Sequence, residues 1–90
     1  MDKIKVTFSD GSTKTFNEEQ TFMAIDFFPD KENPNKNYPS QSGTYGLWSH
    51  IHDGLTPSFL EILANSKFFF DVKNPEITYS AQSIVKLENI

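Results

Sequence analysis

The sequence predicts one small α+β domain, in which an N-terminal β-hairpin and an antiparallel sheet pack against a single short helix. Three observations support this class: apolar and polar residues alternate near the N-terminus, one segment has a helix start signal and an apolar helical pattern, and short strand-like segments follow it. Ninety residues suffice for one domain, and no repeat or linker divides them. We therefore treat 1–90 as a single domain.

The N-terminal alternation runs from Ile4 to Phe8, and Ser12 to Phe16 runs back after a turn at Asp10-Gly11. A two-residue loop would place Phe16 on the face opposite Ile4. A three-residue loop, residues 9–11, instead collects the apolar residues on one face and puts Gly11 at a left-handed position. The pattern therefore predicts the three-residue loop.

The next segment has two interpretations. Asn17 followed by Gln20 matches the capping box of a helix, and a helix from there would stop before Pro29. The residues from Thr21 to Phe28 also alternate in a way that suits a strand. Because the segment is short and aromatic, we favour a strand that begins near Thr21.

Residues 29–46 contain three prolines, two glycines and almost no aliphatic side chain. This composition predicts a long loop, which is either a mobile excursion or a binding loop held on the sheet by Tyr38 and Tyr45. The alternating segment 47–52 is then expected to return to the sheet.

The clearest helix spans about residues 57–65. Thr56 has the character of an N-cap, Pro57 suits the first helical position, and Leu55 is placed to pack against Leu60. Leu60 and Leu63 are expected to face the core. The expected apolar face consists of Phe59, Leu60, Ile62 and Leu63.

Two or three short strands follow the helix, over 68–72, 77–80 and 84–87, with a bend at 81–83. Neighbouring residues on a strand point to opposite faces, so Phe69 points away from Phe68 and Phe70. We expect Phe68 and Phe70 to be core residues. All three rings are dry only if both faces of this strand are covered.

The composition excludes several classes of function. All eight basic residues are lysines, so the chain lacks the planar guanidinium that reads guanine and grips phosphate. It has no cysteine, hence no disulfide, thiolate nucleophile or thiolate metal site. The abundance of Asn, Lys and Ile is typical of AT-rich genes, which points to a low-GC bacterium or one of its phages. Neither a signal peptide nor a membrane-spanning stretch is evident, so we expect a cytoplasmic protein.

His50 and His52 form the one pair that resembles a metal or acid–base site, because side chains two apart on a strand share a face. A third ligand would be required, and histidine pairs this close also arise by chance. No serine lies in a nucleophile elbow, and no glycine-rich loop precedes a helix. We therefore expect no enzyme, no metal and no cofactor, with a small metal-dependent enzyme using these histidines as a distant alternative.

The net charge of −4 is concentrated in residues 17–32, where five acidic residues accompany one lysine (1 − 5 = −4) and the rest of the chain is neutral. Aromatic residues surround these acids, which is typical of protein-binding surfaces. The candidate partner-binding residues are Glu18, Glu19, Asp26, Phe27, Phe28, Tyr45 and Trp48.

These observations favour a small non-enzymatic protein-binding module, either a phage- or mobile-element-type inhibitor or a homodimeric accessory protein. Its expected partner is another protein, for which a basic one is an option, or a second copy of the chain. The alternative is a single-stranded nucleic-acid binder that stacks bases on Phe68 to Phe70. The scattered lysines argue against nucleic acid, since no basic groove accompanies the aromatics.

Overall fold

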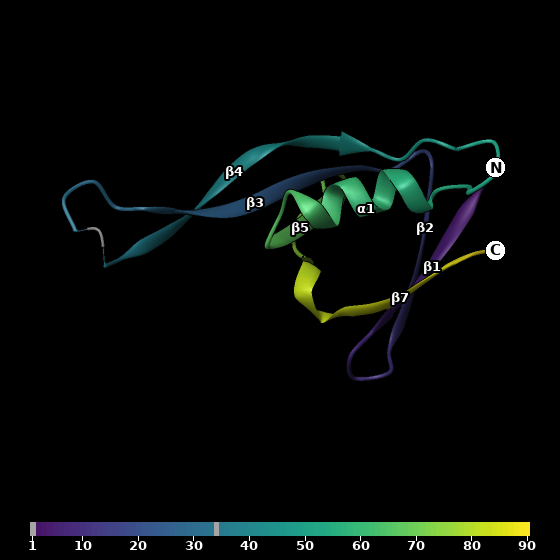
Figure 1. The fold of residues 1–90 in the computed structure, drawn as a ribbon, viewed down its shortest axis with the longest axis horizontal. Helices are drawn as coiled ribbons and strands as arrows, with labels where there is room; N and C mark the ends of the chain where they lie inside the picture. Colours follow the sequence, from purple (N-terminus) through teal and green to yellow (C-terminus); the bar gives the residue numbers. More distant parts are fainter. Residues whose placement is uncertain (1, 34) are drawn as a thin grey trace.

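Two antiparallel sheets and one helix surround a common core in the computed structural model, which describes residues 2–33 and 35–90 (Figure 1). The first sheet has the strand order β2-β1-β7, and the second has the order β4-β3-β5-β6. The α+β class is therefore confirmed. The elements are β1 Lys3–Phe8, β2 Thr13–Asn17, β3 Thr21–Pro29, β4 Asn37–Gly46, α1 Thr56–Ala64, β5 Phe68–Asp71, β6 Thr78–Ser80, the 3-10 helix η1 Ala81–Ser83, and β7 Ile84–Asn89.

The N-terminal hairpin has the predicted register, with Ile4 opposite Phe16. The Phe8 N–H donates to the Ser12 carbonyl at 2.8 Å, which closes a three-residue loop. Gly11 has a φ of +89°, a left-handed backbone conformation that residues other than glycine rarely adopt. Ile4 and Phe16 are both buried, as the choice of register required.

The segment after β2 is a turn followed by a strand, which confirms a strand that begins at Thr21. One of the two capping-box hydrogen bonds nevertheless forms, and the Asn17 side chain closes an Asx turn in place of the other. The Asn17 N–H donates to Gln20 Oε1 at 2.8 Å, and the Glu19 N–H donates to Asn17 Oδ1 at 2.9 Å. The same side chains that cap a helix here close a tight connection between two strands.

The prediction of a long loop at 29–46 is wrong, because most of this segment forms β4. This strand pairs with β3 over its whole length, from Thr21 opposite Gly46 to Pro29 opposite Asn37, with a bulge opposite Ala24 and Ile25. Only residues 30–36 connect the two strands. The segment that forms β4 contains Ser, Gly and Pro and has a low strand propensity. Its pairing with β3 overrides this propensity, because the partner strand supplies the hydrogen bonds of the extended conformation.

The β3–β4 hairpin extends beyond the rest of the second sheet. β5 pairs only with Phe22 to Ile25, so the outer part of the hairpin is a two-stranded ribbon. Figure 1 shows this ribbon projecting away from the body, on the side opposite both termini. We call residues 26–29 together with 37–40 the arm.

Residues 47–52 do not return to the sheet as a strand, contrary to expectation. They form a loop whose one bridge joins His50 to Gly54. The Trp48 N–H donates to the Ser58 hydroxyl oxygen at 3.2 Å, and this hydroxyl lies 3.0 Å from the Leu55 carbonyl. The loop therefore passes over the start of α1 and not along a strand edge.

The helix occurs where it was predicted, but its start and its buried face differ. Its N-cap is Leu55, without a side-chain cap, and Thr56 is the first helical residue. Ser58, Phe59 and Ile62 are buried, whereas Leu60 is 49% exposed. Leu63 is partly buried against the core, so the expectation of two core leucines is wrong for Leu60. The expected packing of Leu55 on Leu60 would require Leu60 to turn inward, and it does not. The inward row consists of Leu55, Ser58, Phe59, Ile62 and Ser66.

The C-terminal strands lie where the sequence placed them, but the phenylalanine triplet faces the other way. Phe69 is fully buried, while Phe68 and Phe70 are partly exposed on the opposite face of β5. Their assignment to the core is therefore wrong. The reason is that α1 covers only one face of the second sheet, through Phe59, whose ring centroid lies 5.7 Å from that of Phe69.

Aromatic rings join the layers of the core. The Phe16 ring from the first sheet lies 5.1 Å from Phe22 in an edge-to-face arrangement and 5.6 Å from Phe59 of the helix. It also lies 5.4 Å from Tyr79 of β6. One side chain thus contacts both sheets and the helix.

Phe59 and Leu60, neighbours in the middle of α1, provide a test of the helix orientation. Phe59→Ala is expected to lower the free energy of unfolding by about 3–5 kcal/mol, because it leaves a cavity among buried rings. Leu60→Ala is expected to cost less than about 1 kcal/mol, because half of this side chain is already in water. Urea denaturation of both variants measures the difference. Equal losses at the two positions would contradict the orientation of the helix.

Candidate protein-binding surface

The second sheet has two different faces because β3 alternates its side chains. Phe22 and Ala24 point to the inner face and are buried. Phe22 meets Phe59 of the helix with ring centroids 6.2 Å apart. Met23 and Ile25 point to the other side, where α1 does not reach.

The strand register gives the composition of that other side. Met23 pairs with Phe70 and Ile25 pairs with Phe68, so these four side chains form the middle of the face. Phe27 continues the row, and its ring lies 5.8 Å from that of Phe68, edge to face. We call this surface the outer face. Around the five apolar residues, the register places Thr21, Pro39, Gln41, Thr44, Thr78 and Ser80 on it.

No charged residue occupies any of these eleven positions, although 20 of the 90 residues are charged (12 + 8). Met23, Ile25, Phe68 and Phe70 are each partly exposed, and Phe27 is 39% exposed. Antiparallel sheets with one solvated face usually carry polar side chains on it. The outer face therefore differs in composition from the solvated face of a typical antiparallel sheet.

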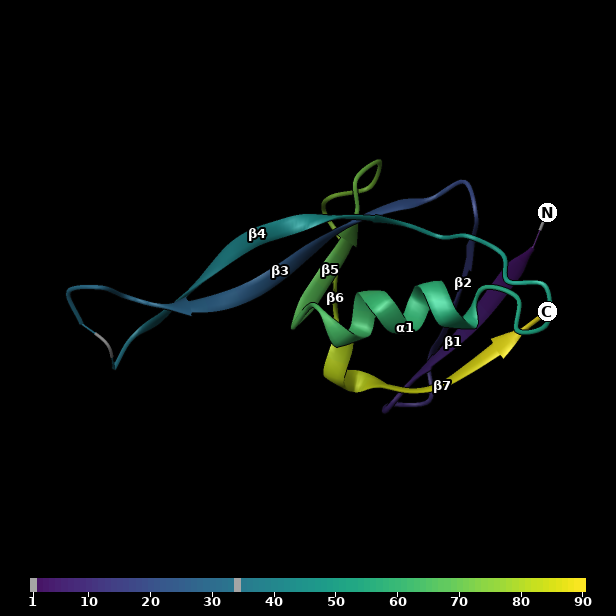
Figure 2. The ribbon, with the colours of Figure 1, turned by 45° about the horizontal axis from the view of Figure 1, so that its top comes forward.

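The loop at residues 72–77 lies at one margin of the outer face. Figure 2 shows the loop at 72–77 rising from the second sheet on the side away from α1, beyond the end of β5. This loop carries Lys73 and Glu76, so charges stand beside the outer face at this margin. The Val72 N–H donates to the Thr21 carbonyl at 3.0 Å, which fastens the start of the loop to β3.

The arm carries two further aromatic side chains on its opposite face. Phe28 and Tyr38 are cross-strand partners, and they are 42% and 49% exposed. An isolated two-stranded ribbon is at best marginally stable in water. Three exposed aromatic side chains on such a ribbon, Phe27, Phe28 and Tyr38, are suited to packing against a partner.

Asp26 lies at the base of the arm, beside the C-terminal end of α1. It lines a cavity of about 210 Å³ with Leu63 and Ala64 of the helix and with Lys67. Its Oδ1 accepts a hydrogen bond from the Phe27 N–H at 2.8 Å. A partner side chain entering this cavity would meet one carboxylate and one ammonium group.

The acidic residues that the sequence grouped together do not form one patch. Glu18 and Glu19 lie in the turn before β3, and Glu18 Oε1 accepts a hydrogen bond from the Asp2 N–H. Asp30 and Glu32 lie beyond the other end of β3. A nine-residue strand separates the two groups by about 30 Å. The charge concentration of residues 17–32 is therefore divided between the two ends of the sheet.

The structure also separates the remaining site residues. Tyr45 is partly buried against the core, and Trp48 is 46% exposed just beyond the end of β4 that pairs with Thr21. Asp26, Phe27 and Phe28 lie toward the opposite end of β3. These three residues are neighbours on β3, but the strand directs Phe27 to the face opposite Asp26 and Phe28, and Trp48 lies at a distance from all of them within one chain.

His50 and His52 lie in the Trp48 loop and are both exposed. Their ring centroids are 6.2 Å apart. The His50 Nδ1 accepts a hydrogen bond from the His52 N–H at 3.2 Å and lies 3.4 Å from Asp53 Oδ2. Across the residues that the structure describes, no three or more histidine, aspartate or glutamate side chains gather in a way that could hold a metal ion.

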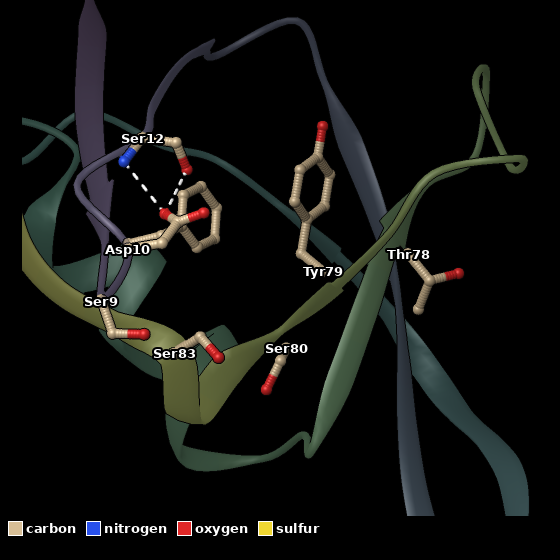
Figure 3. A pocket seen from close by; sticks show the side chains of 8 residues that line it. Ser9, Asp10, Ser12, Thr78, Tyr79, Ser80 and Ser83 are labelled. Atoms are coloured by element: carbon tan, nitrogen blue, oxygen red, sulfur yellow. Dashed lines mark hydrogen bonds between the residues drawn. The ribbon is translucent and has the colours of Figure 1, made fainter.

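A second cavity, of about 360 Å³, lies between the first hairpin loop and β6 (Figure 3). The hydroxyl and the N–H of Ser12 both donate to Asp10 Oδ1, and these hydrogen bonds hold the pKa of Asp10 below its ordinary value. The pKa of Tyr79 is raised mainly by burial of its hydroxyl and secondly by the negative charge of Asp71. The hydroxyls of Thr78, Tyr79 and Ser80 point in different directions in Figure 3, so they do not converge on one ligand.

Met23 and Ile25 were not among the candidate site residues derived from the sequence, and Phe68 and Phe70 were candidates only for stacking nucleic-acid bases. A signal for them was present: β3 and β5 are apolar at consecutive positions, which requires both faces of each strand to be covered. The helix supplies cover for one face only.

Comparison with protein-family models, with curated proteins and with solved structures finds no match to this chain. Within the described residues there is no helix with the length and apolar character needed to cross a membrane.

The loop before α1 gives a test of local geometry. The Asn89 Oδ1 accepts a hydrogen bond from the Leu55 N–H at 3.0 Å, and Gly54 has a φ of +60°. A Cβ at Gly54 would lie 2.6 Å from that Oδ1. Gly54→Ala is therefore expected to destabilise the fold by more than the roughly 1 kcal/mol of a left-handed alanine.

The control is the double-mutant cycle with Asn89→Ala, measured by thermal or urea denaturation. Removing the amide removes the clash, so Gly54→Ala should cost less in the Asn89→Ala background than in the wild type. Equal costs in both backgrounds would contradict the close approach of these two residues.

Proposed function

We propose that this chain is a non-enzymatic protein-binding module that acts through the outer face and the arm. The observation that carries the proposal is the uncharged outer face, with five large apolar side chains and a helix on the other side of the sheet only. Such a module suits an inhibitor or an accessory protein, since neither role requires chemistry by the chain itself.

The energetic argument rests on apolar area. Removing apolar surface from water contributes about 25 cal/mol per Å². The five apolar side chains of the outer face adjoin one another, so a single partner surface can cover all of them together. Phe27 extends the row into the arm, where Phe28 and Tyr38 add aromatic area on the opposite side of the ribbon.

A photo-cross-linking amino acid tests the proposal in the cells from which the gene comes. Placed at Phe70, it is expected to form a covalent adduct with a discrete protein, because this position lies in the middle of the outer face. The matched control places the same amino acid at Leu60, which is exposed on the helix. Adducts are measured by the mass shift on a denaturing gel and by mass spectrometry.

The proposal predicts an adduct from position 70 and none of the same mass from position 60. Absence of a discrete adduct from position 70, in a variant whose circular dichroism matches the wild type, would contradict binding through the outer face. The same adduct from both positions would indicate that cross-linking does not depend on this surface.

A single-stranded nucleic-acid binder is the second candidate. Phe68 and Phe70 point to the same exposed face of β5, and aromatic side chains in this arrangement can stack bases. The uncharged outer face weighs against it, because backbone phosphates require lysine or arginine nearby.

Fluorescence anisotropy with labelled oligo(dT) and oligo(U) separates the two candidates. Nucleic-acid binding would weaken steeply as salt is raised and would be lost in Phe68→Ala. We expect no saturable binding of either oligonucleotide at physiological salt. Saturable binding that Phe68→Ala abolishes would favour the nucleic-acid candidate over the protein-binding one.

A further inference from the structure

We infer that the occupant of the outer face is a second copy of this chain, packed face to face across a twofold axis. The inference rests on the proposed function and names the partner. The outer face has no charge at any of its positions, and its apolar middle consists of cross-strand pairs of β3 and β5.

The absence of charge is what a twofold contact requires. In such a contact each surface meets an identical surface, so a charged side chain near the axis lies close to its own copy and is repelled by it. The ten residues of β4 contain no charged residue at all. On β3 the one charged side chain, Asp26, points to the inner face with Phe22 and Ala24.

A basic partner fits the outer face less well than a second copy does. Glu18 and Glu19 lie before β3, while Asp30 and Glu32 lie beyond it, so no carboxylate of this group is on the outer face. A partner rich in lysine or arginine would bury its own charges against apolar side chains, which is costly without a counter-charge. An identical apolar surface carries no such cost.

The dimensions of the outer face suit a weak dimer. At about 3.3 Å per residue and 4.8 Å between strands, the outer face covers roughly 400 Å² per copy in projection. Two copies together cover about 800 Å² in projection, which is below the roughly 1,000 Å² of a specific interface, so the dimer is expected to be weak. The dimer is therefore expected to depend on protein concentration.

Pairing through the exposed edge of β4 is the competing arrangement, and two features interrupt it. The Phe27 N–H donates to the Asp26 carboxylate, and the Ile25 carbonyl accepts from Lys67 on the β5 side. The backbone polar groups of Ile25 and Phe27 thus point away from β4. Pro39, which lies opposite Phe27, therefore directs its backbone nitrogen toward the open edge of β4, and this nitrogen carries no hydrogen to donate. The bulge at Ser42 breaks the regular spacing of the same edge.

Sedimentation equilibrium over about 1–500 µM protein tests the inference. The wild type is expected to approach twice the monomer mass of 10.3 kDa as its concentration rises. Phe27→Asp is expected to raise the dissociation constant at least about tenfold, because it places a charge where the copies meet. The matched control is Leu60→Asp, which adds the same charge at an exposed site on α1.

The natural absence of cysteine permits a second measurement that does not depend on a disruptive substitution. Ile25→Cys places one thiol in the middle of the outer face, and Val85→Cys places one on exposed β7 of the first sheet. A short bifunctional thiol reagent is expected to link two chains in Ile25→Cys and not in Val85→Cys.

Three results would overturn the inference: a wild type that stays monomeric throughout, equal weakening by Phe27→Asp and Leu60→Asp, or equal cross-linking at both cysteines. These failures are distinct from failure of the proposed function. A monomer whose position 70 forms an adduct with a different protein would leave the protein-binding module standing with another partner. A monomer without any adduct would remove both.

Discussion

Phe16 lies where both sheets and the helix meet, and the arrangement of the molecule depends on it. Its ring contacts Phe22 of β3, Phe59 of α1 and Tyr79 of β6, while its backbone belongs to the first sheet. The three-residue hairpin loop is what turns this ring to the same side as Ile4. A shift of one residue would move Phe16 to the solvent side and leave the second sheet and the helix without their common contact.

The parts of the fold that could be predicted are those fixed by local chemistry. The hairpin register, the strand from Thr21 and the position of the helix each follow from turn residues and alternation. The β4 strand could not be predicted, because its Asn, Pro, Ser and Gly residues have low strand propensity and it is extended only through its pairing with β3. The sequence also left the buried face of the helix undetermined, because leucine or isoleucine occurs on both of its sides. The face that is buried is the one from which Ser58 reaches the Trp48 loop.

The candidate site was predictable in its chemistry and not in its geometry. The sequence indicated an aromatic protein-binding surface near β3, but residues that are adjacent in an extended strand alternate between faces and spread over its length. Phe27 and Phe28 therefore point to opposite sides of the arm. Trp48 lies beyond the other end of the hairpin, where Gly46 pairs with Thr21. Phe68 and Phe70 join Phe27 only because the register of β5 on β3 places them in one row, and that register is a tertiary contact.

The β4 edge and the outer face differ in composition, and the difference bears on how copies of the chain would associate. Pro39 and the bulge at Ser42 interrupt the open edge, which otherwise would add strands without limit. No charged residue occupies the eleven positions of the outer face, and Lys73 and Glu76 lie only at its margin. Contact through an open edge can propagate from chain to chain, whereas a twofold contact between two faces closes after one partner. If two copies meet as inferred, an obstructed long edge and an apolar face would together give an association that ends at one partner.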